Sequence, residues 1–398
     1  MKERGFFLMK EKDLARLVKE DEVVKMSQDL VRTQSVNPPG NELAAAEYVV
    51  EALKKSGVEA ELVKHSDTRA SALARLKGQG KVPALFYNGH LDTVPVGTEK
   101  WIHEPFGGEV AEGKIWGRGA ADMKSGLAAM MAAMKVLAEA RLPLKGDLIL
   151  AATAGEEIDS LGATAVAKML SQEPIQALFI AEPTYNEIYI AEKGVFWVQV
   201  DTFGKTAHGS MPEKGRNAVM MMVKIINELE KVEIPYKPHP ILGGFSRSIN
   251  TVSGGIKTNV VPDHCVATID MRTVPGQDHS AILRRIENVI KDLSQKIPDF
   301  KATVKAVNDH VSVETSPSDP IVQKFSAVVT EMTGQKGVLK GANYFSDAVG
   351  FLPILKLPLI LFGPGEPGQA HQPNEHVEVS RLVEAARIFA VAAARLLG

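Results

Sequence analysis

The segment Asn88–Pro95, which reads NGHLDTVP, places a histidine and an aspartate two residues apart, directly after the apolar run VPALFY. Side chains at positions i and i+2 of a strand point to the same face, so we expect His90 and Asp92 to lie side by side. One interpretation is a surface turn, in which Asp92 and Pro95 are ordinary turn residues. The other is a metal-binding histidine whose ring is oriented by a neighbouring carboxylate.

Other ionisable side chains stand where strands are expected to end or where glycine is abundant. Asp122 lies in GRGAADMKSG, and the pair Glu156 and Glu157 follows the apolar run ILAATAG. Glu182 follows LFIA, and His371 lies in GPGEPGQAHQPNEH. Each has a simpler explanation, as a helix cap, a solvated acidic pair or a polar loop residue.

Together these residues have the composition of a hydrolytic metal site. Two histidines and several carboxylates, without cysteine, are nitrogen and oxygen donors that suit zinc or cobalt. Two ions about 4 Å apart need one bridging carboxylate, and one histidine and one carboxylate for each ion. The count assigns Asp122 as the bridge, His90 and Glu182 to one ion, and Glu157 and His371 to the other.

Two acidic residues are left over from this count. We expect the carboxylate of Asp92 to hydrogen-bond the distal nitrogen of His90 and so to fix the imidazole ring. Glu156 is adjacent to a ligand, where it can act as the general base that takes a proton from the attacking water. Neighbouring glutamates fit these two roles if a turn carries them, because their side chains can then face in different directions.

The elements that must position these residues alternate between strands and helices. Apolar spacing predicts helices over Asp13–Val31, Glu42–Ser56 and Ser125–Ala140, with apolar strands such as KVPALFYNGH between and after them. This alternation predicts an α/β fold with a mixed, largely parallel sheet flanked by helices. Ligands gather at the carboxyl ends of the strands in such sheets, and that is where the candidate residues lie.

A second pattern begins near Lys193. The chain then reads strand–helix–strand–strand–helix–strand, with helices through Asn217–Leu229 and Ile282–Leu293, which is typical of a ferredoxin-like α+β unit. An α/β pattern resumes after Ser316, and the chain ends in a helix over Ser380–Leu397. We therefore assign 1–192 and 309–398 to a catalytic domain and 193–308 to an inserted domain.

Composition excludes several classes of protein. The 398 residues carry a net charge of −2 with scattered lysines and arginines, which argues against a partner that is nucleic acid or an anionic membrane. The single cysteine, Cys265, excludes an intrachain disulfide and a cysteine-based metal site. The apolar run Phe6–Met9 is too short for a signal segment, and no run approaches the roughly 18 apolar residues that span a bilayer. A cytoplasmic location is expected.

Five segments occur in an order that resembles the M20 metallopeptidase family: GHLDTVP, GRGAADMKSG, AGEE, AEPT and the late GPG…AHQPNEH. That family includes acetylornithine deacetylase, succinyl-diaminopimelate desuccinylase, aminoacylase-1 and carboxypeptidase G2. The resemblance extends from Asn37 to the C-terminus. Each segment alone is moderately specific, whereas all five in order are very specific.

The resemblance implies a zinc-peptidase-like catalytic domain with two divalent ions, zinc first, with cobalt or manganese as alternatives. It implies the ligand and base roles counted above, and a lid that also forms a homodimer. In that lid, His208 matches a histidine that relatives contribute across the dimer to polarise the substrate carbonyl. Asn259 and Arg272 match positions that hold the carboxylate end of the substrate. Gly363 is expected to allow close approach of the backbone to the substrate.

The function implied is hydrolysis of the amide bond of N-acyl amino acids or small peptides, of the acetylornithine deacetylase or succinyl-diaminopimelate desuccinylase type. Carboxypeptidase or dipeptidase action is the alternative within the family, and Ser346 and Asp347 are candidates for lining the acyl pocket. The alternative of another class is a non-catalytic protein that binds small amides. Such a protein should lack a ligand or the base, but all seven residues are present here.

Overall fold

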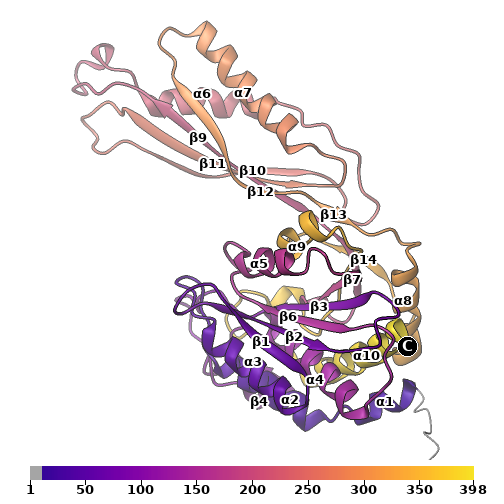
Figure 1. The fold of residues 1–398 in the computed structure, drawn as a ribbon. Coiled ribbons are helices and arrows are strands. Elements are labelled where there is room, and N and C mark those ends of the chain that lie inside the picture. Colours follow the sequence, from indigo (N-terminus) through magenta and orange to yellow (C-terminus); the bar gives the residue numbers. More distant parts are fainter. Residues whose placement is uncertain (1–10) are drawn as a thin grey trace, which may run out of the picture. The chain divides into compact units, whose positions relative to one another are not determined.

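The computed structural model describes residues 11–398, and the apolar run Phe6–Met9 discussed above lies outside them. The chain divides into two compact units. The first extends to Ile190 and takes in Thr315–Lys340 and Ser346–Gly398, and the second comprises Ala191–Glu314 and Gly341–Phe345. Figure 1 shows their elements. The inserted domain expected from the sequence covers 193–308, within the second unit. Its role as a lid and dimerisation domain stays a prediction.

The largest sheet has the strand order β1-β2-β6-β3-β7-β15-β8-β13, with β14 also paired to β8, and all of these strands except β13 belong wholly or in part to the first unit. The strands β6, β3, β7 and β15 are mutually parallel, whereas β1, β2 and β8 pair antiparallel with their neighbours. The predicted mixed, largely parallel sheet is thus confirmed. The bounds are β1 Glu59–Lys64, β2 Ala70–Leu76, β3 Ala84–His90, β6 Leu148–Thr153, β7 Ile175–Ile180, β8 Ile188–Glu192, β13 Val313–Glu314, β14 Leu339–Ala342 and β15 Leu359–Leu361.

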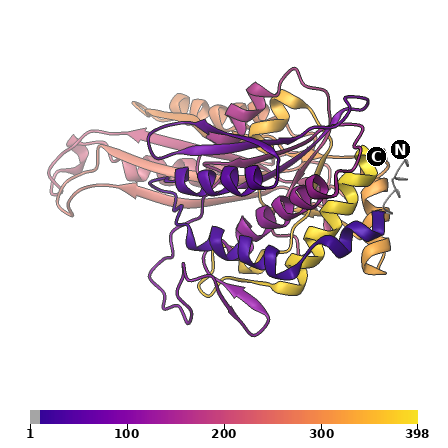
Figure 2. The ribbon, with the colours of Figure 1, turned by 60° about the horizontal axis from the view of Figure 1, so that its bottom comes forward.

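Helices cover both faces of this sheet. On one face α2, α4 and α10 lie side by side, as Figure 2 shows, and α3 packs on β1 and β2. The other face carries α5 and α9. Every residue of β3 is buried between these layers, which explains its uninterrupted apolar sequence. The bounds are α1 Glu11–Leu17, α2 Glu20–Arg32, α3 Leu43–Lys55, α4 Ser125–Ala140, α5 Leu161–Met169, α8 Pro320–Thr333, α9 Ala348–Leu355 and α10 Val379–Leu397.

The predicted helix over Asp13–Val31 is wrong in one respect, because two helices, α1 and α2, occupy this range. Lys19 between them has an extended backbone, with φ −88° and ψ 129°. Three acidic residues, Glu20 to Glu22, fill the first turn of α2, where the helix dipole favours negative charge.

The second unit contains β9 Gly194–Phe203, α6 Ala218–Leu229, β10 Ser246–Gly254, β11 His264–Thr273, α7 His279–Lys296 and β12 Ala302–His310, in that order. Its antiparallel sheet has the strand order β10-β11-β9-β12, which is the ferredoxin-like arrangement. Alternate residues of β11 are buried, and the apolar faces of α6 and α7 complete the same core.

A small third sheet pairs β4 Glu109–Ala111 with β5 Lys114–Trp116, and β5 with β16 His376–Glu378. It joins two parts of the chain that are more than 250 residues apart. Short helical turns lie at η1 Ala120–Lys124, η2 Pro212–Lys214 and η3 Pro367–Gln369. Among the described residues 11–398, no helix is both long and apolar enough to cross a membrane.

Candidate metal centre

The parallel strands bring the sequence candidates to one edge of the sheet. His90 is the last residue of β3, Glu156 and Glu157 lie in the turn after β6, and Glu182 follows β7. Parallel strands end on the same side, so residues far apart in sequence meet there. A turn does carry the glutamate pair, as expected from the sequence.

Three overlapping groups of potential ligand atoms form at this edge. Within each group the ligand atoms all lie within 4.8 Å of one another. Asp122 is common to two of the groups, and His90 and Glu157 also occur twice. The groups are His90 with Asp122 and Glu182, Asp122 with Glu157 and His371, and His90 with Glu156 and Glu157.

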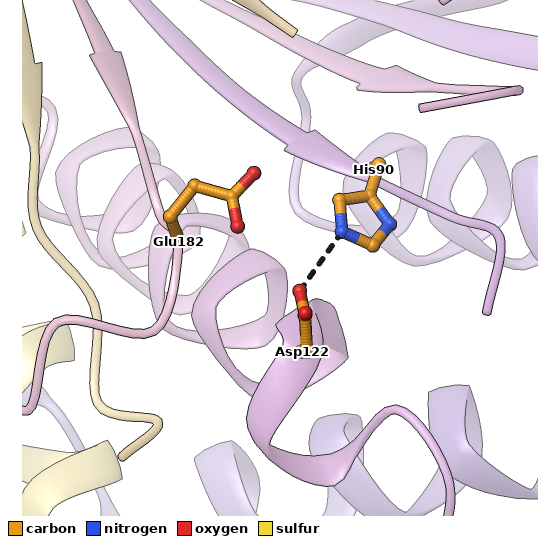
Figure 3. A group of neighbouring side chains, drawn as sticks. All are labelled: His90, Asp122 and Glu182. Carbon is orange, nitrogen blue, oxygen red and sulfur yellow. Dashed lines mark hydrogen bonds and ion pairs between the residues drawn. The ribbon is translucent and has the colours of Figure 1, made fainter. Parts of the chain in front are cut away.

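The first group is shown in Figure 3, where the side chains of His90, Asp122 and Glu182 point toward one another. His90 Nε2 lies 3.1 Å from Asp122 Oδ1. Nδ1 of His90 donates its hydrogen to a main-chain oxygen. In the neutral ring Nε2 therefore carries a lone pair, which faces the Asp122 carboxylate. A proton or a cation must lie between these two acceptors.

Asp122 belongs to η1, where its φ of −124° and ψ of 97° are not helical. The helix-cap alternative does not apply, because the N-cap of α4 is Lys124 and no side chain caps it. Asp122 Oδ2 lies 3.5 Å from His371 Nε2, which is 3.2 Å from Glu157 Oε2. One carboxylate thus faces both histidines.

Asp92 makes a different contact from the one expected. His90 Nδ1 donates to the main-chain oxygen of Asp92 at 2.9 Å, whereas Oδ1 of Asp92 is 3.7 Å away. The side chain instead accepts backbone N–H groups from Gly155, Glu156 and Glu157 and the amide of Asn37. The strand ends at His90, so the i, i+2 rule no longer applies at Asp92. Three unpaired N–H groups in a buried turn need an acceptor, and Asp92 provides it.

Burial and crowded charge shift the pKa values of the cluster. Burial, together with nearby carboxylates, raises the pKa of Glu156 and of Glu182 well above the ordinary value. Burial lowers the pKa of His90, but the hydrogen bond to Asp122 and the surrounding carboxylates outweigh it and raise that pKa well above its usual range. These surroundings therefore disfavour a negative charge on Glu156 and Glu182, and a bound cation would offset that effect.

The donors fit divalent ions. Glu182 is 3 % exposed, and its Oε1 finds no hydrogen-bond partner among the residues the structure describes. A buried, unpaired carboxylate oxygen beside His90 and Asp122 is costly unless a cation binds it. The nitrogen and oxygen donors suit zinc, cobalt or manganese.

Gly363 follows β15 and packs against the segment that carries Glu182. A Cβ at this position would lie 2.3 Å from the oxygen of Ala181 and 2.4 Å from that of Glu182. At Gly365 it would lie 2.2 Å from the oxygen of Ala121. Both glycines therefore allow close backbone packing behind Glu182 and Asp122. The expected approach of Gly363 to substrate stays a prediction.

Three sequence candidates belong to the second unit. His208 and Asn259 are exposed in neighbouring loops, which are joined by the hydrogen bond from Gly209 N to the oxygen of Asn259. Arg272 lies on β11, with its Nε 3.0 Å from Asp270 Oδ1. The metal centre belongs to the first unit, and the expected meeting of these residues with it stays a prediction.

Three further buried residues near the cluster were missed as candidates, although all stand in the sequence motifs. They are Arg118, Lys124 and Glu375. Burial lowers the pKa of Lys124 to about 7, and its Nζ donates to the oxygen of Thr33. For Arg118 and Lys124 the signal was the charge itself, in a segment made mostly of glycine, alanine and other small or apolar residues.

Comparison with known proteins decides the family. The model of peptidase family M20/M25/M40 matches residues 86–395. The chain belongs to peptidase family M20. It is therefore a metal-dependent hydrolase, as the sequence predicts, and the members of this family bind divalent metals.

Individual M20 proteins are similar over nearly the whole chain. A probable succinyl-diaminopimelate desuccinylase of Staphylococcus epidermidis is 30% identical over 389 residues, covering 91% of this chain and 94% of that protein. The M20 metallo-carboxypeptidase Sso-CP2 of Sulfolobus solfataricus has a TM-score of 0.79 at 20% identity, covering 94% and 98%. The aminopeptidase PepT of Bacillus cereus has a TM-score of 0.77 at 21% identity, covering 96% and 100%. At these identities the two structures show the shared fold.

Proposed function

We propose that this M20 hydrolase cleaves the amide bond of N-acyl amino acids, with succinyl or acetyl groups as the acyl class, using two divalent ions. The observation that carries the proposal is the pair of ligand groups sharing Asp122, one with His90 and Glu182 and the other with Glu157 and His371. Zinc is the preferred ion, with cobalt or manganese as alternatives. The similarity to a probable desuccinylase supports the substrate class.

The five residues of these two groups would hold the ions. When bound, the ions supply Lewis acidity that polarises the substrate carbonyl and acidifies water, and positive charge that offsets the crowded carboxylates. The chain supplies orientation, because the hydrogen bond from Nδ1 to the main-chain oxygen of Asp92 turns His90 Nε2 toward Asp122 and the site.

Glu156 is the proposed general base. Its side chain is buried, and its backbone N–H donates to Asp92, which fixes the turn that carries Glu156. Glu156 takes a proton from the attacking water as the new C–O bond forms. It then delivers this proton to the amide nitrogen as the C–N bond breaks, which releases a carboxylate and an amine.

The second unit is proposed to complete the site. His208 would donate to the developing oxyanion, and Arg272 and Asn259 would bind the substrate carboxylate. Asp270 already pairs with Arg272 and fixes the guanidinium, leaving Nη1 outside that pair. A homodimer formed through this unit and a cytoplasmic location belong to the same proposal.

The test is a panel of N-succinyl amino acids, N-acetyl amino acids and dipeptides, assayed with zinc, cobalt or manganese and again after chelation. We expect chelator-sensitive release of free amine from the N-acyl amino acids. Cleavage of dipeptides alone would favour the carboxypeptidase or dipeptidase alternative. A protein that binds two ions but hydrolyses none of these amides would contradict the proposal and favour a binding role.

A further inference from the structure

A buried ion pair links two of the segments that carry proposed ligands. Arg118 and Glu375 are 2 % and 0 % exposed, and Arg118 Nη1 lies 2.6 Å from Glu375 Oε2. Arg118 stands four residues before Asp122, and Glu375 stands four residues after His371. Arg118 therefore belongs to the segment that carries Asp122, and Glu375 belongs to the segment that carries His371.

Glu375 binds the backbone of the segment that carries Asp122. Its Oε1 accepts the N–H groups of Ala121 and Asp122 at 2.8 and 3.0 Å. Its Oε2 accepts the N–H of Gly119 at 3.1 Å in addition to Arg118. Because η1 is not a regular helix, these N–H groups have this carboxylate as their acceptor, and it fixes the path of the backbone at Asp122.

Arg118 makes the reciprocal contacts with the segment that carries His371. It donates to the main-chain oxygens of His371 at 3.4 Å and Gln372 at 3.2 Å. His371 has a φ of 64°, in the left-handed region that non-glycine residues rarely adopt. The guanidinium thus binds the turn that directs the His371 ring toward Asp122 and Glu157.

The third sheet brings the two segments together. β5 ends at Trp116, β16 begins at His376, and these two residues pair. The pairing continues as a hydrogen bond from Gly117 N to the oxygen of Glu375 at 2.9 Å. The indole of Trp101, 5.1 Å from the guanidinium, packs on Arg118.

We propose that Arg118 and Glu375 are positioning residues that set the spacing between Asp122 and His371, and so create the second ion site formed with Glu157. This inference rests on the proposed function, which makes these three residues ligands. The pair holds the backbone of Asp122, which both ion sites share, but it contacts neither His90 nor Glu182 in any described hydrogen bond or ion pair. For the second site it holds the segments of two of the three ligands, Asp122 and His371, so that site should depend on the pair more than the first.

The test is a titration of the full-length, metal-free protein with Co²⁺. Binding is measured by calorimetry and by the visible absorption of the bound ion. We expect the wild type to bind two ions. Glu375→Gln and Arg118→Met should each weaken the binding of one ion about 10–100-fold, the usual effect of removing a group that orients a ligand, and weaken the binding of the other ion less. Thermal unfolding of each metal-free variant is measured alongside.

The double variant Arg118→Met/Glu375→Gln separates positioning from stability. Each single variant leaves a buried group without its partner, and this lowers stability. The double variant leaves no lone buried charge, so its melting temperature should recover relative to Arg118→Met. Its affinity for the second ion should stay low, because methionine donates no hydrogen bond to the His371 segment and glutamine keeps only one acceptor oxygen for the Asp122 segment.

Arg75→Met is the matched control. Arg75 also pairs with two carboxylates, Asp147 at 2.7 Å and Glu173 at 2.6 Å, at the amino ends of β6 and β7. We expect Arg75→Met to have a lower melting temperature than the wild type but to bind both ions with wild-type affinity. If Glu375→Gln and Arg118→Met also bind both ions at wild-type affinity, the positioning role is overturned while the ligand assignment stands. A wild type that binds no second ion overturns both.

Discussion

The carboxylate of Asp92 accepts a hydrogen bond of 3.2 Å from the backbone N–H of Glu156. It also accepts the N–H groups of Gly155 and Glu157, while the main-chain oxygen of Asp92 accepts from the ring of His90. A single residue thus orients a proposed ligand through its backbone and, through its side chain, fixes the turn that carries the proposed base.

Asp92→Asn tests this division. The amide NH₂ cannot accept a hydrogen bond, so part of the Gly155–Glu157 turn loses its acceptor. We expect kcat to fall about 10–100-fold, with ion binding at His90 retained because that contact uses the main chain. Asn37→Ala is the control, since it removes one donor to Asp92 and leaves the turn contacts intact. Unchanged kcat in Asp92→Asn would contradict the assignment.

Glu156→Gln tests the base. The amide has nearly the same shape but cannot take a proton from water. We expect both ions to bind and kcat to fall about 10²–10⁴-fold, measured together with metal content on the same preparation. Near-wild-type turnover would sink the assignment of Glu156.

Asp347 gives a prediction for stability against pH. This carboxylate is fully buried at the start of α9, next to the hydroxyl of Thr153, and burial raises its pKa from 3.8 to about 6. Between these values the folded state holds more protons than the unfolded state, so the free energy of unfolding falls as pH rises from about 4 to 6.

Asp347→Asn removes this titration and keeps an oxygen that can accept from Thr153. In metal-free protein the variant should become more stable relative to wild type as pH rises through this window, by up to about 3 kcal/mol. Denaturant unfolding at pH 4 and pH 7 measures the difference. A difference that does not change with pH would contradict the buried, raised pKa.

Gly363→Ala tests the close packing behind Glu182. The new methyl group would meet the oxygens of Ala181 and Glu182, and we expect a loss of about 1–3 kcal/mol in unfolding free energy, with weaker ion binding. Gly368→Ala is the control, because the nearest atom to its Cβ is 3.9 Å away. Equal stability of the two variants, measured by denaturant unfolding, would rule out the packing argument.

The meeting of the candidate residues at one edge of the sheet could be predicted, because the carboxyl ends of parallel strands lie on the same edge. His90, Glu182 and the glutamate pair are local to such ends, so sequence alone placed them together. The break between α1 and α2 was missed because no glycine or proline marks it, although the acidic turn Glu20–Glu22 is a signal for a helix start.

The contacts of Asp92, Arg118 and Glu375 could not be predicted. They depend on which backbone N–H and carbonyl groups lack partners in turns and in η1, and this is a property of the folded backbone. The pairing of β5 with β16 joins residues more than 250 positions apart, and their short sequences carry no signal for the partner.

The two-ion centre is tested most directly by the number of ions that the wild type and His371→Ala bind, measured on metal-free protein by cobalt titration and metal analysis. We expect two ions per chain in the wild type and one in His371→Ala, because His90, Asp122 and Glu182 still form the other group. One ion per chain in both proteins would contradict a two-ion centre that shares Asp122.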